Sequence, residues 1–249
     1  MIAVMKGFIH SFESLAAVDG EGLRYAVFLS GCPLRCAYCH NPDTWTGGGG
    51  REMEAEALAD KLARYKPYFG ESGGVTFSGG EPLLQAAFLR ELMPLLRERG
   101  IRYVLDTSGA VPLDETVRTV LGGAQSVLLD LKFWDEESYR RYTGRGMAQT
   151  LDMLRYLNAV GTRTRVRTVI VPGINDREEI LERYLRHLWG MSCVERYELL
   201  GFHTMGFFKY ETLGLPNPLA DKPALEPAVR ERLQRFADKR LAEMKQIIK

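Results

Sequence analysis

The stretch GVTFSGGEPLLQAAFLRELMPLLRERGIRYVLD, residues 74–106, contains the arrangement of elements on which the fold depends. Residues 74–78 are an apolar, β-rich run, residues 82–99 have a helical pattern of apolar side chains, and residues 101–106 are a second β-rich run. A strand that is followed by a helix and another strand indicates two parallel strands joined by a crossover helix.

The same alternation continues along the chain. We expect strands at residues 25–30, 74–78, 101–106, 126–132, 163–171 and 194–200. We expect helices at residues 52–65, 82–99, 113–121, 149–160, 177–189 and 226–248. Six βα units predict an α/β fold with a parallel sheet, in the form of a partial (β/α)6 TIM-like barrel, with a doubly wound sheet as the alternative. We interpret residues 1–249 as a single domain, with an irregular N-terminal extension at about 1–24 and a C-terminal helix at about 225–249.

Composition excludes some classes of function. The 249 residues include 45% hydrophobic ones, which is enough for a sizeable core. A net charge of +1 gives no general attraction to nucleic acid or to anionic lipid. We see neither a signal peptide nor a run of ~20 apolar residues, so we expect a cytoplasmic protein with no membrane and no nucleic-acid partner.

Polar residues follow several of the expected strands, at the edge where ligands bind in parallel α/β folds. They are Cys32, Cys36 and Cys39 after the first strand, Gly79-Gly80-Glu81-Pro82 after the second, Asp106-Thr107 after the third, Asp130 and Lys132 after the fourth, and His203 after the sixth. Asp and Thr at strand ends are also common helix N-caps, which is the alternative role for Asp106 or Thr107.

The cysteine loop, GCPLRCAYCHN at residues 31–41, carries three of the four cysteines. Its spacing allows three thiolates to converge on one metal centre. A cubane iron–sulfur cluster that is bound by three thiolates keeps one iron open for chemistry. The alternative is structural zinc with His40 as a fourth ligand, although His40 directly follows Cys39, which is awkward for a tetrahedral site. The fourth cysteine, Cys193, stands alone and is expected to be a small buried hydrophobe.

The Cys-x3-Cys-x2-Cys spacing, with Tyr38 before the third cysteine, resembles the signature of the radical S-adenosylmethionine (SAM) superfamily. Within it, the chain looks like the pyruvate formate-lyase activating enzymes over nearly its whole length. The matching segments are Ser11-Phe12-Glu13-Ser14, Val18-Asp19-Gly20, Gly22-Leu23-Arg24, Gly31-Cys32, Tyr38-Cys39-His40-Asn41, Asp43-Thr44-Trp45, Ser78-Gly79-Gly80-Glu81, Asp130-Leu131-Lys132, Val169-Ile170-Val171-Pro172-Gly173 and Glu198-Leu199-Leu200-Gly201-Phe202-His203. Two positions depart from the family pattern: Glu21 stands where a proline is common, and Gly201 diverges.

The resemblance implies a 4Fe-4S cluster on Cys32, Cys36 and Cys39. The reduced cluster would cleave SAM into methionine and a 5′-deoxyadenosyl radical, which removes a hydrogen from a glycine of a glycyl radical enzyme. Residues 45–55 contain no cysteine, whereas many related activases have a ferredoxin-like insert there. This excludes auxiliary clusters and favours pyruvate formate-lyase as the partner, with a low-potential electron donor such as flavodoxin. The alternatives are another glycyl radical enzyme, a small-molecule radical reaction, or a non-catalytic metal-binding module.

The resemblance also implies a set of SAM-binding residues: Tyr38, Cys39, His40, Gly79, Gly80, Glu81, Asp130, Leu131, Lys132, Arg167 and His203. In this interpretation Gly79, Gly80 and Glu81 line the methionine moiety. The alternative role for Glu81 is to cap the helix that begins at Pro82. Lys132 pairs with the methionine carboxylate. The adenine and ribose lie near Tyr38, His40, Arg167 and His203, and Asp106, Thr107 and Asp130 bind a monovalent cation. Arg163, Arg165 and Arg167 share one face of their strand, and the sequence leaves open whether this face meets ligand or solvent.

Overall fold

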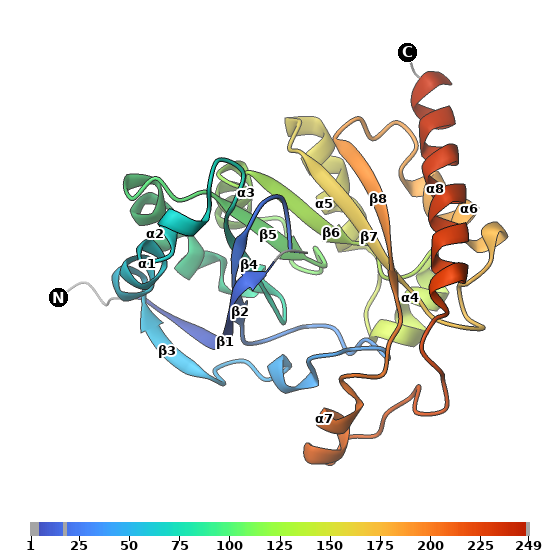
Figure 1. Ribbon diagram of the computed structural model, residues 1–249, viewed down its shortest axis with the longest axis horizontal. Helices are drawn as coiled ribbons and strands as arrows, with labels where there is room; N and C mark the ends of the chain where they lie inside the picture. The colour runs from blue at the N-terminus through green and yellow to red at the C-terminus, as the bar shows by residue number, and fades with distance from the viewer. Residues whose placement is uncertain (1–4, 17–18, 248–249) are drawn as a thin grey trace. The chain divides into compact units, whose positions relative to one another are not determined.

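The computed structural model describes residues 5–16 and 19–247 (Figure 1). The chain divides into two compact units: the first contains residues 1–33 and 44–128, and the second contains residues 34–43 and 129–249. The interpretation as a single domain with terminal extensions stays a prediction. Its residues 1–4, 17–18 and 248–249 lie outside the described residues.

The sheet has eight strands in the order β3-β1-β2-β4-β5-β6-β7-β8. Their bounds are β1 Lys6–Ala16, β2 Arg24–Leu29, β3 Arg51–Glu54, β4 Gly74–Gly79, β5 Tyr103–Thr107, β6 Ser126–Asp130, β7 Thr164–Ile170 and β8 Val194–Gly201. The pairs β2/β4, β4/β5 and β7/β8 are parallel. All six predicted strands are confirmed, with bounds that agree to within two residues. The predicted α/β class with a mostly parallel sheet is therefore confirmed.

Strands β2 and β4 place the functional loops of the first unit. Nearly every side chain in both strands is buried, as expected for parallel strands that are covered on both faces. Their register pairs Leu29 with Gly79, the last residue of each strand. The cysteine loop and the Gly-Gly-Glu loop therefore leave the sheet side by side.

The expectation of an irregular N-terminal stretch is wrong, because residues 6–16 form the strand β1. This strand pairs antiparallel with β2 and, through its first residues, with β3. Two irregularities, between Ile9 and Ser11 and between Ser14 and Ala16, interrupt its period-two pattern and hid it in the sequence. The short strand β3 similarly occupies the start of the helix predicted at 52–65.

The helices of the first unit are α1 Ala55–Ala63, α2 Ala86–Glu98 and α3 Glu115–Gly122, with short 3₁₀ turns η1 Pro42–Thr44 at the junction of the units, η2 Lys66–Tyr68 and η3 Pro82–Gln85. Those of the second unit are α4 Glu136–Thr143, α5 Ala148–Val160, α6 Glu178–His187, α7 Phe207–Thr212 and α8 Pro227–Ile247. In Figure 1, α8 lies along β8. Within the described part of the chain, no helix is long and apolar enough to cross a membrane.

Helices α4 and α7 were absent from the prediction. Helix α4 buries only Tyr139 and Thr143, so apolar periodicity is weak there. Its signal lies in its ends instead: the side chain of Asp135 caps the first turn by accepting from the Ser138 amide, and Gly144 ends the helix in the left-handed region. Helix α7 has six residues, which is too short for a periodic pattern.

Candidate active site

The first part of the cysteine loop is fixed by backbone hydrogen bonds within the first unit. The amide of Gly31 donates to the carbonyl of Thr44 at 2.7 Å, and that of Cys32 donates to Trp45 at 3.3 Å. The amide group of the Gln85 side chain adds a brace just before the loop. It donates to the carbonyls of Phe8 (3.0 Å) and Ser30 (2.9 Å) and accepts from the Phe8 amide at 2.8 Å. Several hydrogen bonds therefore hold the backbone between the end of β2 and Cys32.

Glycines 79 and 80 let the end of β4 pack directly on the start of this loop. The amide of Gly80 donates to Leu29 at 2.9 Å, and that of Glu81 donates to Gly31 at 2.7 Å. A Cβ on Gly80 would overlap the carbonyl oxygen of Gly31, and a Cβ on Gly79 would overlap the backbone of Leu29. These two glycines are thus required for close approach between two loops of the protein itself.

The side chain of Glu81 is fully buried and saturated with hydrogen bonds. One oxygen accepts from the Leu83 amide (3.1 Å) and the Thr107 hydroxyl (2.6 Å), and the other accepts from the amide (2.9 Å) and hydroxyl (2.6 Å) of Ser108. Burial raises the pKa of this carboxyl above its usual value, although the four donors oppose the shift. The structure thus shows the capping alternative for Glu81: its side chain starts η3 and ties the end of β4 to the end of β5.

The second part of the cysteine loop is held by α4 in the second unit. The amide of Arg35 donates to the carbonyl of Thr143 at 2.7 Å, and that of Ala37 donates to Tyr142 at 2.8 Å. The loop then tightens, because the Cys39 amide donates to the Cys36 carbonyl at 3.0 Å. Tyr38, which lies between Cys36 and Cys39 in the chain, is buried, and its ring centroid is 5.8 Å from that of Phe133.

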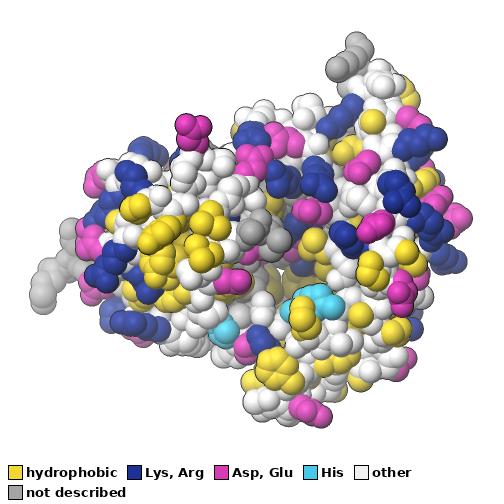
Figure 2. All heavy atoms as spheres, viewed as in Figure 1, with side chains coloured by type: hydrophobic (Ala, Val, Ile, Leu, Met, Phe, Trp, Pro, Cys, Tyr) yellow, Lys and Arg dark blue, Asp and Glu magenta, His cyan; other side chains and the backbone are white. Residues whose placement is uncertain are grey.

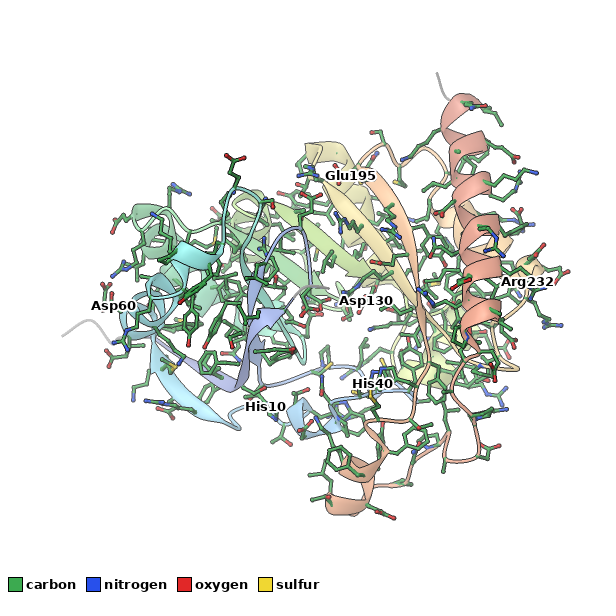
Figure 3. The ribbon with its side chains drawn as sticks, in the orientation of Figure 1. His10, His40, Asp60, Asp130, Glu195 and Arg232 are labelled. Carbon is green, nitrogen blue, oxygen red and sulfur yellow. The ribbon has the colours of Figure 1, made fainter. Side chains whose placement is uncertain are left out.

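A partly buried charge cluster lies at the end of β6. The carboxylate of Asp130 receives the ammonium of Lys132 at 2.7 Å and Nε of Arg167 at 2.9 Å (Figure 3 labels Asp130). Burial alone would raise the pKa of Asp130, but attraction to Arg167 and Lys132 holds it below its usual value. Burial would likewise lower the pKa of Lys132, and the negative charges of Asp130 and Cys36 raise it instead. At neutral pH the cluster therefore has two cations for one carboxylate.

Two of the three arginines at residues 163–167 have different surroundings in the structure. Arg167 is buried and pairs with Asp130, whereas Arg163, just before the strand, is exposed and pairs with Glu195 at 2.6 Å. The amide of Leu131 donates to the carbonyl of Arg167 at 2.9 Å, and its side chain is buried. This hydrogen bond holds the backbone between Asp130 and Lys132 against the backbone of Arg167.

His40 and His203 meet in a stacked pair in the second unit. Their ring centroids are 3.7 Å apart at an interplanar angle of 15°, and Nε2 of His40 lies 3.1 Å from the carbonyl oxygen of His203. Burial, and then the neighbouring His203, lower the pKa of His40 to about 4, and burial lowers the pKa of His203. Both rings are therefore neutral at pH 7. The zinc alternative is not supported, because the ring of His40 is engaged with His203.

Two residues that the sequence reasoning missed hold the end of the cysteine loop. The hydroxyl of Tyr210 donates to the carbonyl of Cys39 at 3.0 Å. The ammonium of Lys209 contacts Asn41 at 2.8 Å and Asp43 at 3.0 Å. Both residues belong to α7, so only recognition of this short helix could have pointed to them.

The three residues predicted to bind a cation have other partners in the structure. The hydroxyl of Ser78 donates to Asp106 at 2.8 Å, Thr107 donates to Glu81, and Asp130 joins the charge cluster. Over residues 5–16 and 19–247, no group of three or more His, Cys, Asp or Glu side chains is placed to hold a single metal ion. The monovalent cation site stays a prediction.

Comparison with known proteins agrees with this geometry. Residues 26–184 match the family model described as the radical SAM superfamily, which is more than half of the chain. The pyruvate formate-lyase-activating enzyme of Clostridium pasteurianum is 43% identical over 234 residues, covering 94% of this chain and 98% of the relative. The enzyme of that name from Staphylococcus aureus (strain USA300) is 40% identical over 228 residues, covering 89% and 91%.

Solved structures show the same fold at low identity. A domain of pyruvate-formate lyase-activating enzyme from Bacteroides vulgatus matches with a TM-score of 0.55 and 22% identity, over 67% of this chain and 94% of that one. Streptococcus suis SuiB bound to its precursor peptide SuiA matches with a TM-score of 0.64 and 16% identity, over 86% and 44%.

The fold and the cysteine loop thus define an enzyme of the radical SAM type. The chain belongs to the radical SAM superfamily and, within it, to the family of the pyruvate formate-lyase-activating enzymes. This membership confirms the resemblance seen in the sequence and excludes a non-catalytic metal-binding module.

The residues of the cysteine loop suit the cofactors of the superfamily, a 4Fe-4S cluster and SAM. None of the three forms a disulfide, Cys36 is buried, and Cys32 and Cys39 are partly exposed. The ammonium of Lys132 acts electrostatically on Cys36, so a thiolate at this position has a cation to stabilise it. Cys193 differs from these three, because burial raises the pKa of its thiol and disfavours the thiolate.

Proposed function

We propose that this chain installs a glycyl radical on pyruvate formate-lyase, using SAM as the cosubstrate. The single observation that carries the proposal is 43% identity, over almost the full length of both chains, to a relative of that name. Three cysteines that form no disulfide lie in one loop held by backbone hydrogen bonds, and this arrangement supports the proposal chemically. We further propose a cytoplasmic location, where thiols stay reduced, and a low-potential donor such as flavodoxin.

The cluster on Cys32, Cys36 and Cys39 supplies, when bound, one electron that cleaves SAM into methionine and a 5′-deoxyadenosyl radical. The protein positions the reactants and limits the access of water. The loops that follow β2 and β4 are locked together by Gly80 and Glu81, so the backbone around Cys32 is preorganised. The charge cluster has an excess positive charge that can receive the methionine carboxylate.

The histidine pair supports a role in binding the adenosine moiety. Nδ1 of His203 is buried and has no hydrogen-bond partner within the described ranges, so it is available to a ligand. The two neutral rings present flat aromatic surface, on which a purine base can stack. Tyr38 keeps the loop between Cys36 and Cys39 in place from the buried side.

Replacement of Lys132 by Ala should weaken SAM binding and leave the cluster in place. Asp130 keeps Arg167 as a partner in this variant, so the partly buried carboxylate is not left unpaired. The loss of one charge-assisted contact corresponds to about 2 kcal/mol, or roughly a thirtyfold rise in Kd. Calorimetric titration of the reconstituted enzyme with SAM measures it. Arg163→Ala, which removes an exposed cation just before β7, serves as the control. Unchanged affinity in Lys132→Ala would contradict the proposed role.

Transfer of deuterium tests the proposed function directly. Pyruvate formate-lyase with its glycines deuterated at the α-carbon is incubated with the reduced enzyme and SAM. We expect a glycyl radical in the paramagnetic resonance spectrum and deuterium in 5′-deoxyadenosine in equal amounts. Radical formation with unlabelled 5′-deoxyadenosine would overturn direct abstraction. Activity only on another glycyl radical enzyme would retain the chemistry and change the partner.

A further inference from the structure

Four exposed arginines lie on the cysteine loop and on the helix that is hydrogen-bonded to it in the second unit. Arg35 lies between Cys32 and Cys36, and Arg140, Arg141 and Arg145 lie on α4 and the turn that follows it; we call these four residues the arginine patch. All four are exposed. The patch is connected to the loop by the backbone hydrogen bonds from Arg35 to Thr143 and from Ala37 to Tyr142. The charge is thus presented by the same segments that hold Cys36.

Packed aromatic rings connect the patch to the interior of the loop. The guanidinium of Arg141 lies 5.3 Å from the ring centroid of Tyr142, which stacks on Phe133 at 4.6 Å and 18°. Phe133 in turn contacts Tyr38, the residue before Cys39, with ring centroids 5.8 Å apart. Protein packing is therefore continuous from the patch to the cysteine loop.

The patch is cationic by its balance of charged residues, because four arginines stand against Glu136 and Glu137 of α4. Glu136 pairs with Arg140 and also accepts from the Met147 amide at 2.9 Å. Glu137 is exposed on the first turn of α4, whereas Asp135, at its N-cap, pairs with Arg183 of α6 at 2.5 Å. The carboxylate of Glu136 thus lies among the arginines, and four arginines outnumber the two glutamates of α4. A surface hollow of about 320 Å³, lined in part by Glu136, Arg140 and Arg145, opens beside the arginines.

We propose that the arginine patch is the docking surface for an acidic one-electron carrier protein that reduces the cluster. The inference rests on the proposed function only in requiring that the loop holds a cluster that accepts an electron. One electron leaves the carrier, which is oxidised, and enters the cluster, which is reduced; no bond or proton is transferred. The patch offers the carrier charge complementarity on segments that are hydrogen-bonded to each other on either side of Cys36, and opposite charges both raise the association rate and orient the encounter.

The test uses the cluster-loaded enzyme with the double substitution Arg141→Glu and Arg145→Glu. Neither residue is a cluster ligand or part of the charge cluster. The matched control is Arg232→Glu with Arg235→Glu, two exposed arginines on α8 that give the same change in net charge. Figure 2 shows that Lys and Arg side chains also gather along α8, so the control alters a surface of similar composition. The probes are reduced flavodoxin of acidic net charge and, separately, a photoreduced deazaflavin that needs no docking.

Two quantities are measured at low ionic strength: the rate of cluster reduction from its absorbance, and the Kd of the complex of oxidised flavodoxin with the enzyme. The patch variant should lose about tenfold or more in both, and the salt dependence of its rate should flatten. Deazaflavin should reduce both variants and the parent at equal rates. The α8 control should behave as the parent does.

The proposal is overturned if flavodoxin reduces and binds the patch variant as it does the parent, or if the α8 control loses as much. It is also overturned if the deazaflavin rate falls equally, since the substitutions would then act on the cluster itself. No glycyl radical enzyme is present in the assay. A wrong partner in the proposed function therefore leaves this result unaffected.

Discussion

Replacement of Cys36 by Ala should abolish the reductive cleavage of SAM. Two thiolates would remain in the loop, and a cubane cluster in this superfamily requires all three. We expect the variant to lose its bound iron and the broad absorbance of the cluster near the blue region. Formation of 5′-deoxyadenosine should fall by at least about a thousandfold, which corresponds to about 4 kcal/mol in the activation barrier. Iron analysis and product chromatography after anaerobic reconstitution measure both effects. Cys32→Ala and Cys39→Ala should give the same result.

The control for this series is Cys193→Ala. Cys193 is buried near the start of β8, and its side chain behaves as a small apolar group. Its substitution should leave iron content and product formation unchanged and cost about 1 kcal/mol of stability from lost packing. Full iron loading and activity in Cys36→Ala would contradict the assignment of the cluster, whereas loss of iron in Cys193→Ala would show that Cys193 takes part.

Replacement of Gly80 by Ala should disrupt the junction between the cysteine loop and the Gly-Gly-Glu loop. The new methyl group would overlap the carbonyl oxygen of Gly31 and press on Cβ of Cys32. Backbone must move to admit it, because neither obstacle is the end of a flexible side chain. We expect a loss of about 3 kcal/mol in the free energy of unfolding, together with reduced iron loading, since the shift is imposed next to a cluster ligand. Denaturant unfolding of the apoprotein and iron content after reconstitution measure the two effects separately.

Gly122→Ala provides the matched control. Gly122 is the last residue of α3, and a Cβ placed there meets no heavy atom within 4 Å. The same chemical change should therefore be neutral or raise stability by up to about 1 kcal/mol, because alanine restricts the unfolded chain. If Gly80→Ala unfolds and loads iron as the parent does, the close contact is not essential, and the role of Gly80 would have to come from contact with SAM alone.

The two glycines also show how structure changes the meaning of a motif. The family resemblance implies that Gly79-Gly80-Glu81 lines the methionine moiety. In the structure, neighbouring backbone packs where a Cβ of either glycine would lie. Both oxygens of the Glu81 carboxylate already accept hydrogen bonds from residues 83, 107 and 108. Any contact of this motif with SAM must therefore involve its backbone. A Glu81 substitution that lowers activity would have to be separated from a loss of stability.

The sequence by itself determined the features that depend on local periodicity and spacing. The alternation of apolar runs with helical patterns predicted six of the strands, because a buried strand and an amphipathic helix each leave a pattern within a few residues. The spacing of Cys32, Cys36 and Cys39 predicted a metal centre, since ligands in one short loop are brought together by the chain itself, and the resemblance to the radical SAM superfamily implied that it is a 4Fe-4S cluster. The strand β1 and the helix α4 were not predicted, because bulges in β1 and charged residues in α4 obscure the apolar pattern.

Only the tertiary structure decided which polar groups pair with one another. Asp130 and Arg167 are 37 residues apart, and His40 and His203 are 163 residues apart, so no local rule pairs them. Strand register and packing bring them together, and burial then makes pairing necessary, because an isolated charge in the interior is costly. For the same reason the structure alone could show that Lys132 already faces Asp130 and that α4 and α7 hold the cysteine loop.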